Sequence, residues 1–571
     1  MAEFQPTQSK KVVLLGFGRT SRPLAERVQE ILKEKYHLDS ELPPENEKHS
    51  WSGQTKTVSI LGAYRDNELG SKCGVESAER IYHGAHAYIV QRTRTYDDTL
   101  EFWARDLEKT LKEIQWRINQ EPELAGMFGN TFLRLEDHLA RFRGVVDTGG
   151  EKKYAALRSI PDHDIRKVLI LADRAKRYGA ESVVLASPKS SYEWSHNAAK
   201  YAGEGLDESN TLAQTVMFYR QNGISGWVAM HFHAPHDVLK HARSLTTEIP
   251  VMNIIDVNPQ SYVTFNGEMV RLEEIFSGLN LGSDYFRPFD PLIRETIVQT
   301  GRKFSLEEEL AKNLVVINCS DQGALRATEE VACHYGLSRI TSQKARFGEG
   351  DTERNQGDSL FDYLDRITTR IIDRGIDPHK TRLEVTILNM DDKLNSGGTA
   401  NTEAKARKDE IEIYNKGIRA DVFTSDGDQS REENYKSYIA SLRKQAGELD
   451  DQRQDSLLRQ IKFLEENPEG HGTRYSSEFH LYCSHIRTPD LRRLKHRYID
   501  RFVVSDSVPY FPPLLEQLKE YEEDVPGLKG IHSKFRVLEF SADQIAAGIA
   551  LDFYRKDERY KAHIDSLRTA A

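Results

Sequence analysis

Cysteine is scarce in this sequence: there are four in 571 residues, far apart and without a CxxC pair. This usage argues against a disulfide framework and a structural zinc site, and it is typical of a reducing compartment. Long hydrophobic runs are also missing, because no stretch reaches the roughly 18 apolar residues of a membrane-spanning helix. The opening residues, MAEFQPTQSKK, lack the apolar core of a signal peptide. We therefore expect a cytoplasmic protein with no membrane partner.

An excess of basic residues is missing as well. Lysine and arginine number 79 against 89 aspartate and glutamate residues, which gives a formal net charge of -10. A general nucleic-acid surface needs a basic footprint, so we expect no nucleic-acid partner. Hydrophobic residues make up 38% of the chain and charged residues 29%, which is apolar enough to bury cores. The length exceeds that of one ordinary core and predicts two domains.

Short apolar runs recur along the chain, and helical patterns lie between them. The runs are KKVVLLGFG, HAYIVQ, ESVVLAS, SGWVAMHFHA, KNLVVINCSD, TRLEVTILNMDD and DRFVVSDSV. Such alternation predicts an α/β fold with central parallel sheets flanked by helices. A mixed, turn-rich stretch over about 255–310 predicts a boundary between two α/β domains, residues 1–255 and 256–571.

Two stretches have the character of helical insertions. Residues 105–165 have a mostly helical pattern with few strand signals. Residues 426–476 are very charged and predict an exposed helical hairpin, whose charges form a solvated face.

The segment LNMDDKLNSGGTA at residues 388–400 ends an apolar run in which Leu383, Val385 and Ile387 alternate as in a strand. A helical pattern follows, so the loop joins the carboxyl end of a strand to a helix N-terminus, where open α/β sheets bind ligands. The two glycines and the free N–H groups favour a phosphate, and the acidic pair suits sugar hydroxyls or a bridging Mg²⁺. The segment therefore predicts a phosphorylated sugar such as ribose 5-phosphate. The same residue types also occur as plain caps and turn formers.

DDKLNSGGT resembles the phosphoribosyl-binding loop of type I phosphoribosyltransferase-fold proteins, which usually reads DDxxDTGGT. Further segments are similar to those of the ribose-phosphate pyrophosphokinases, the phosphoribosyl pyrophosphate (PRPP) synthetases, in the same order over about residues 11–550. They are YRDNE (64–68), ESAERIYHGAHAYIVQ (76–91), MHFHAPH (230–236), NCSDQGALRA (318–327), KAR (344–346), FHLYCSH (479–485) and RFVVSDSVP (501–509).

The resemblance implies two tandem phosphoribosyltransferase-like domains, Mg²⁺ as cofactor and a homo-oligomer. It implies a ribose-phosphate diphosphokinase, an enzyme that makes PRPP and AMP from its partners ATP and ribose 5-phosphate. Two other functions stay open at this point. One is a non-catalytic homologue that regulates or scaffolds a partner, and the other is a phosphoribosyltransferase that consumes PRPP. A single domain would suffice for the latter, so the tandem arrangement disfavours it.

The resemblance also assigns roles to individual residues. Lys344, Arg346 and His233 are the implied catalytic residues, and the polar FGEGDTERNQGD after the basic pair is placed to close over the site. His233 and Asp321 would hold Mg²⁺ on the ATP phosphates. The implied ATP-binding residues are Tyr64, Asp66 and Glu68. The implied ribose 5-phosphate residues are Asp391, Asp392, Asn395, Ser396, Gly397, Gly398 and Thr399.

The histidine-rich MHFHAPH segment admits other interpretations. His231 and His233 are two apart on the expected strand, so their side chains would face the same way. An HxHxxH pattern also fits a transition-metal site, or a polar strand end with solvated histidines.

Three departures from the family pattern affect mainly the ATP side. The family's Arg-Gln pair for ATP is absent from SPKSSYEWSHN at 187–197, where Lys189 is a candidate substitute. The aspartate of the family's DLHA segment is replaced by His231. On the sugar side, Asn395 replaces the aspartate of DTGGT, and it cannot act as a base or attract a cation as strongly. The sequence thus keeps the sugar side better than the ATP side.

Overall fold

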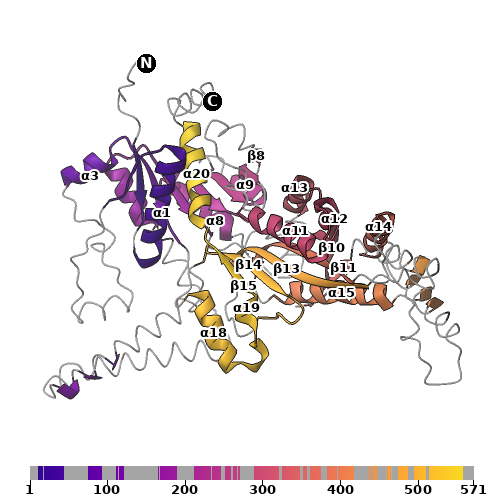
Figure 1. Ribbon diagram of the computed structural model, residues 1–571. Coiled ribbons are helices and arrows are strands. Elements are labelled where there is room, and N and C mark those ends of the chain that lie inside the picture. The colour runs from indigo at the N-terminus through magenta and orange to yellow at the C-terminus, as the bar shows by residue number, and fades with distance from the viewer. Residues whose placement is uncertain are drawn as a thin grey trace. The chain divides into compact units, whose positions relative to one another are not determined.

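The computed structural model describes residues 11–43, 75–92, 165–189, 211–258, 262–270, 288–319, 325–416, 474–486, 494–508 and 513–556, with short gaps, and scattered residues within 111–120 and 436–465. Figure 1 shows the chain, which divides into two compact units. The first unit comprises residues 1–286, 506–514 and 539–571, and the second comprises residues 287–505 and 515–538. The expected insertions lie mostly outside the described residues. Their scattered described positions are helical, except that residues 474–476, at the end of the second expected insertion, begin a strand.

The first unit is built around an eight-stranded sheet with the order β2-β1-β3-β4-β5-β6-β7-β8. Strand pairing is parallel from β2 to β6, and β7 and β8 add two antiparallel strands at one edge. The strands are β1 (Val12–Leu15), β2 (Ser40–Glu41), β3 (His86–Val90), β4 (Ser182–Ser187), β5 (Gly226–Met230), β6 (Asn253–Asn258), β7 (Tyr262–Phe265) and β8 (Glu268–Val270).

The bounds of this unit differ from the expected domain 1–255. Residue 255 lies inside β6, and the stretch NPQSYVTFNGEMV, which we interpreted as part of a boundary, supplies β7 and β8. These strands pair with β6 and therefore extend the first sheet. The C-terminal helix α20 (Ser541–Lys556) also belongs to the first unit.

Helices cover both faces of the first sheet. Val12 and Leu14 of β1 belong to one buried cluster, and Val13 and Leu15 belong to the other. A strand buried on both faces is typical of a parallel sheet between helices. The first cluster contains side chains of α1 (Gly18–Tyr36) and α20. The second contains side chains of α3 (Val75–Tyr82), the helical residues 168–177, α8 (Thr211–Gln221) and α9 (Pro235–Leu245).

α20 packs directly on the sheet through a glycine. A Cβ atom added to Gly548 would lie 2.3 Å from Val228 Cγ1 of β5 and 3.2 Å from Val257 Cγ2 of β6. The Tyr88 hydroxyl of β3 donates a hydrogen bond of 2.9 Å to Asp552 of the same helix. The C-terminal helix is therefore an integral layer of the first core.

Replacing Gly548 with alanine is expected to destabilise the first unit by about 1–3 kcal/mol, because the added methyl group overpacks this contact. Helix propensity alone would favour alanine by roughly 0.5–1 kcal/mol. Urea unfolding measures the difference. Gly447→Ala is the matched control, because this helical position leaves open space around an added Cβ. Equal stability of the Gly548→Ala variant and the parent would contradict the close packing.

The second unit is built around a seven-stranded sheet with the order β11-β10-β9-β12-β13-β14-β15. All neighbours in it are parallel except β10 and β11. The strands are β9 (Val315–Cys319), β10 (Ser338–Phe347), β11 (Asp351–Gln356), β12 (Arg382–Leu394), β13 (Arg474–Ile486), β14 (Arg501–Ser505) and β15 (Phe535–Leu538). The main helices are α11 (Asp290–Phe304), α12 (Glu308–Lys312), α13 (Leu325–Tyr335), α14 (Leu360–Asp373), α15 (Gly398–Lys416), α18 (Leu514–Asp524) and α19 (Ile531–Lys534).

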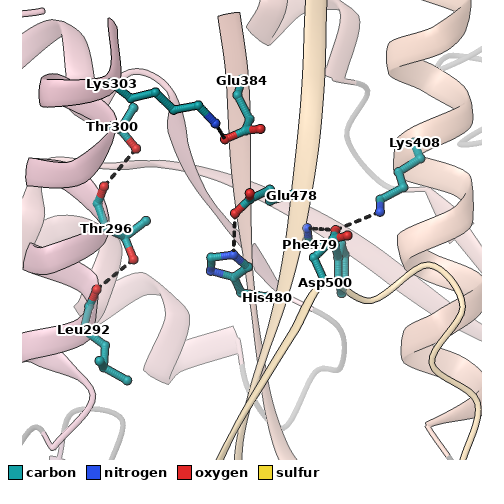
Figure 2. Close-up of polar contacts among 10 residues, drawn as sticks. All are labelled: Leu292, Thr296, Thr300, Lys303, Glu384, Lys408, Glu478, Phe479, His480 and Asp500. Atoms are coloured by element: carbon teal, nitrogen blue, oxygen red, sulfur yellow. Dashed lines mark hydrogen bonds and ion pairs between the residues drawn. The ribbon is translucent and has the colours of Figure 1, made fainter. Parts of the chain in front are cut away.

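Figure 2 shows that α11 and α15 lie on opposite sides of β12 and β13. Lys303 of α11 makes a 2.5 Å ion pair with Glu384 of β12, and Lys408 of α15 makes a 2.7 Å ion pair with Asp500. The predicted α/β class, with two mostly parallel sheets flanked by helices, is therefore confirmed. Among the described helices, none is both long and apolar enough to cross a membrane.

Candidate functional site

The segment that the sequence singled out joins β12 to α15 in the second unit. β12 is a central strand, and its residues Leu383 to Met390 are mostly buried, with β9 on one side and β13 on the other. The strand continues to Leu394, so Asp391 and Asp392 lie within its last residues instead of beyond its end. Asp391 pairs with Cys483 of β13 in the register and is only partly buried. A carboxylate thus stands at the carboxyl edge of the sheet.

Gly397 makes the turn from this strand into the helix. Its φ of +69° lies in the left-handed region, which side chains other than glycine rarely adopt. An added Cβ would lie 2.8 Å from the carbonyl oxygen of Lys495, a backbone atom that cannot simply rotate away. Both the conformation and the space therefore require glycine at this position.

α15 begins at Gly398, and a neighbouring segment holds its first turn. Asn401 N–H donates to the Gly397 carbonyl at 2.8 Å, and the Asn401 side-chain oxygen accepts from Tyr498 N–H at 2.9 Å. The first turn carries no acidic side chain. The helix dipole and the unpaired N–H groups of a first turn attract an anion. The connection from Asp391 to Gly398 can thus place a phosphate beside a carboxylate.

A buried ionic network lies behind this connection. Arg407 of α15 is fully buried, donates to Glu403 at 3.0 Å and to Glu410 at 2.9 Å, and reaches Asn318 of β9 at 3.5 Å. Asn318 in turn donates to Asn389 of β12 at 2.5 Å. The network ties α15 to the two strands whose carboxyl ends form the candidate site.

Burial sets the protonation behaviour of this network. Burial raises the pKa of Glu410 above its ordinary value, and the nearby Arg407 opposes that rise. Burial also disfavours charge on Arg407, but the attraction of Glu410 and Glu403 outweighs it and raises the pKa of Arg407. Arg407 therefore stays charged, and it needs both glutamates as partners.

Lys344 and Arg346 lie on β10. Residues 338–341 of this strand pair with β9, whereas residues 342–347 pair with β11 alone. Lys344 stands opposite Arg354, and Arg346 stands opposite Thr352. The two basic residues therefore lie on a two-stranded antiparallel arm, although the resemblance implies a loop here.

In the first unit, the carboxyl end of β5 turns sharply. The strand ends at Met230, and His231 adopts a left-handed φ of +53°. We predicted that His231 lies on the strand, with its side chain facing the same way as that of His233. This prediction is wrong for His231, because the strand ends one residue before it. His231 N–H donates to Val257 O at 3.1 Å, and Phe232 N–H donates to Asp256 at 2.6 Å. These bonds hold a conformation that costs about 1–3 kcal/mol in a residue other than glycine.

Five residues of the expected sugar site lie on the connection from β12 to α15: Asp391, Asp392, Gly397, Gly398 and Thr399, with Asp392 and Thr399 described by their backbone alone. Other expected residues lie outside the described residues: Tyr64, Asp66, Glu68, His233, Asp321, Asn395 and Ser396. Among the described residues, no group of three histidine, cysteine or acidic side chains is arranged to hold a metal ion.

Sequence reasoning missed Arg407 and Asp256. Glu403, Arg407 and Glu410 follow the i, i+4, i+7 spacing of one helix face, which is a signal for the network, but the same spacing is common on solvated helices. No local pattern in the sequence points to Asp256, because its partner Phe232 follows β5 whereas Asp256 lies in β6.

No family model and no curated protein match the sequence. Among solved structures, the phosphoribosylpyrophosphate synthetase from Mycobacterium smegmatis is similar with a TM-score of 0.39 and 10% sequence identity, over 96% of this chain and 100% of that chain. A similarity of this size carries no argument about function, which has to come from the residues themselves.

Proposed function

We propose that the chain is a ribose-phosphate diphosphokinase, which makes PRPP and AMP from ATP and ribose 5-phosphate. The connection from Asp391 through Gly397 to α15 is the observation that carries the proposal. It combines a carboxylate, a glycine in the left-handed region and a helix N-terminus at the carboxyl edge of a parallel sheet. The ordered motifs of the sequence support it. The 5-phosphate would bind the first turn of α15, and Asp391 would accept the ribose hydroxyls.

In the proposed reaction, the C1 hydroxyl oxygen of ribose 5-phosphate attacks the β-phosphorus of ATP. The bond from this phosphorus to the oxygen bridging the α- and β-phosphates breaks, AMP leaves, and the hydroxyl proton is lost to solvent. Such chemistry depends mainly on positioning and on stabilisation of negative charge. Lys344 and Arg346 of β10 would supply positive charge for the transferring group.

Mg²⁺ would neutralise charge on the ATP phosphates, with Asp321 and His233 as the proposed ligands. The carboxylate of Asp321 suits a hard cation, whereas the imidazole of His233 suits it less well. Both residues lie outside the described part of the chain. The role of this chain's own residues is to hold the sugar with its C1 hydroxyl toward the phosphate chain.

Substitution of Lys344 by alanine is expected to lower turnover by about 10²–10³-fold, the effect of removing one group that stabilises transition-state charge. An AMP-forming assay with ATP and ribose 5-phosphate measures it, and circular dichroism checks that the variant is folded. Arg339→Ala is the matched control, because Arg339 lies on the same strand and pairs with Glu329 on the surface. Unchanged turnover in folded Lys344→Ala would remove Lys344 from the catalytic residues.

The proposal as a whole is tested by incubating purified protein with Mg²⁺, ATP and ribose 5-phosphate and quantifying AMP, ADP and PRPP. We expect AMP and PRPP in equal amounts and no ADP. Binding of ribose 5-phosphate without any product would instead favour a non-catalytic homologue. Consumption of added PRPP with release of pyrophosphate would favour a phosphoribosyltransferase.

A further inference from the structure

The connection between β12 and α15 packs against residues 494–500, which we call the brace segment. The carbonyl oxygen of Lys495 lies 2.8 Å from an added Cβ at Gly397, and Tyr498 N–H donates to the Asn401 side chain, as described above. The brace segment therefore contacts both the glycine turn and the first turn of the helix. It is itself neither helix nor strand, so groups outside it have to satisfy and fix its backbone.

Lys534, the last residue of α19, donates to two carbonyl oxygens of the brace segment. Its Nζ lies 3.0 Å from His496 O and 2.7 Å from Ile499 O. Ile499 N–H also donates to His496 O at 3.2 Å, so Lys534 bridges the two ends of a tight turn. Hydrogen bonds from a charged donor are roughly twice as strong as neutral ones. One ammonium group thus fixes the turn that contains Tyr498.

The surroundings of Lys534 fit this role. The residue is partly buried, and burial lowers its pKa, whereas the attraction of Asp500 opposes that lowering. Asp500 is the last residue of the brace segment and is itself fixed. It accepts from Phe479 N–H at 2.8 Å and pairs with Lys408 of α15 at 2.7 Å (Figure 2). This end of the brace segment is therefore tied to both the sheet and the helix.

His496 connects the brace segment to the short helix η5 (Pro526–Leu528) that precedes α19. Its Nε2 lies 2.8 Å from the carbonyl oxygen of Gly527. A carbonyl oxygen can only accept, so Nε2 carries the proton and donates it. The side chain of His496 is buried, with 8% of its surface exposed. The conformation of the glycine turn thus depends on residues 526–534, which lie far from it in sequence.

We infer that Lys534 is a positioning residue for ribose 5-phosphate, because it holds the brace segment and thereby the Gly397 turn and the first turn of α15. The inference rests on the proposed function, since it concerns how that function's sugar phosphate is positioned. A turn that is held before the ligand arrives saves the cost of ordering it on binding. Loss of such an interaction weakens the ground state and the transition state alike, so it raises KM and leaves kcat unchanged.

The test uses Lys534→Met, because methionine removes the charge and both hydrogen bonds but keeps an unbranched side chain. We expect the Kd for ribose 5-phosphate by calorimetry, and its KM in the AMP-forming assay, to rise about tenfold. The kcat and the KM for ATP should stay within about twofold of the parent values. Lys534→Arg can still donate to both carbonyls and should restore most of the affinity. Lys529→Met is the matched control, because Lys529 is exposed and directly follows η5.

Folded Lys534→Met with an unchanged Kd for ribose 5-phosphate, or with a lower kcat and an unchanged KM, would overturn the inference. Amide exchange without ligand adds a readout that is independent of the proposed activity. Asn401 N–H, which donates to Gly397 O, should exchange about tenfold faster in Lys534→Met than in Lys529→Met. Equal exchange rates would also overturn the inference. If Lys534→Met does not fold, the parent decides: ribose 5-phosphate should slow exchange at residues 498–499, and unchanged exchange there overturns the inference.

Failure of the inference and failure of the proposed function are separable. PRPP formation with a ribose 5-phosphate affinity that does not depend on Lys534 would remove only the inference. Faster Asn401 exchange and weaker ribose 5-phosphate binding in Lys534→Met, in protein that forms no PRPP, would remove only the proposed activity.

Discussion

Replacing Arg407 with methionine is expected to destabilise the second unit by about 3–5 kcal/mol, the loss found when one partner of a buried ion pair is removed. The arginine is fully buried between Glu403 and Glu410, which are themselves 1% and 7% exposed. Without it, two buried carboxyl groups and the side chain of Asn318 lose a donor. Urea unfolding measures the loss, and amide exchange of α15 assigns it to the second unit.

The control for this prediction lies on the same helix. Lys405 pairs with Asp409 at 3.0 Å, but both side chains are about half exposed. Exposed pairs at this spacing contribute roughly 0.3–0.5 kcal/mol, so Lys405→Met should leave stability nearly unchanged. A similar loss of unfolding free energy in Lys405→Met and Arg407→Met would show that buried and exposed charges on α15 contribute equally to stability. The buried network would then have no special role.

Replacing Gly397 with alanine is expected to weaken ribose 5-phosphate binding at least tenfold. The added Cβ would lie 2.8 Å from the Lys495 carbonyl oxygen, and the residue would have to keep a φ of +69°. Strain of this kind costs about 1–3 kcal/mol, so the loop should move away from the conformation that presents the first turn of α15. Calorimetry with ribose 5-phosphate measures the affinity, and urea unfolding measures the accompanying loss of stability.

Gly336→Ala separates the steric contact from the backbone conformation. Gly336 has a similar φ of +66°, but nothing lies within 4 Å of an added Cβ. The control variant therefore carries the strain of a left-handed residue without the clash and outside the connection between β12 and α15. Its ribose 5-phosphate affinity should equal that of the parent. Equal affinity of Gly397→Ala as well would mean that this connection does not bind the phosphate.

Local sequence patterns predicted the elements that carry the candidate sugar site. Alternation of Leu383, Val385 and Ile387 and the helical residues after Gly398 predicted β12 and α15, and both are present. The strand extends past the predicted end at Asp392, because pairing with β13 continues to Leu394. Backbone pairing with a distant strand is a tertiary effect, and no local pattern reports it.

The parts that escaped prediction depend on contacts between distant segments. The Tyr88–Asp552 hydrogen bond that joins α20 to the first sheet spans 464 positions of sequence. The left-handed His231 donates to the carbonyl of Val257, and the next residue, Phe232, donates to Asp256, and both acceptors lie on the separate strand β6. Periodicity describes how one segment folds, and it contains no information on which distant segment packs against it.

The most direct test of the central claim is the fate of the β-phosphorus of ATP. The protein is incubated with Mg²⁺, ribose 5-phosphate and ATP labelled at the β-phosphorus, and the products are separated and counted. The account predicts that the label appears in PRPP, that AMP is unlabelled, and that the two form in equal amounts. Two results would contradict diphosphoryl transfer, provided that the protein binds ribose 5-phosphate. In one, the label stays in ATP; in the other, it appears in ADP or inorganic phosphate and no PRPP forms.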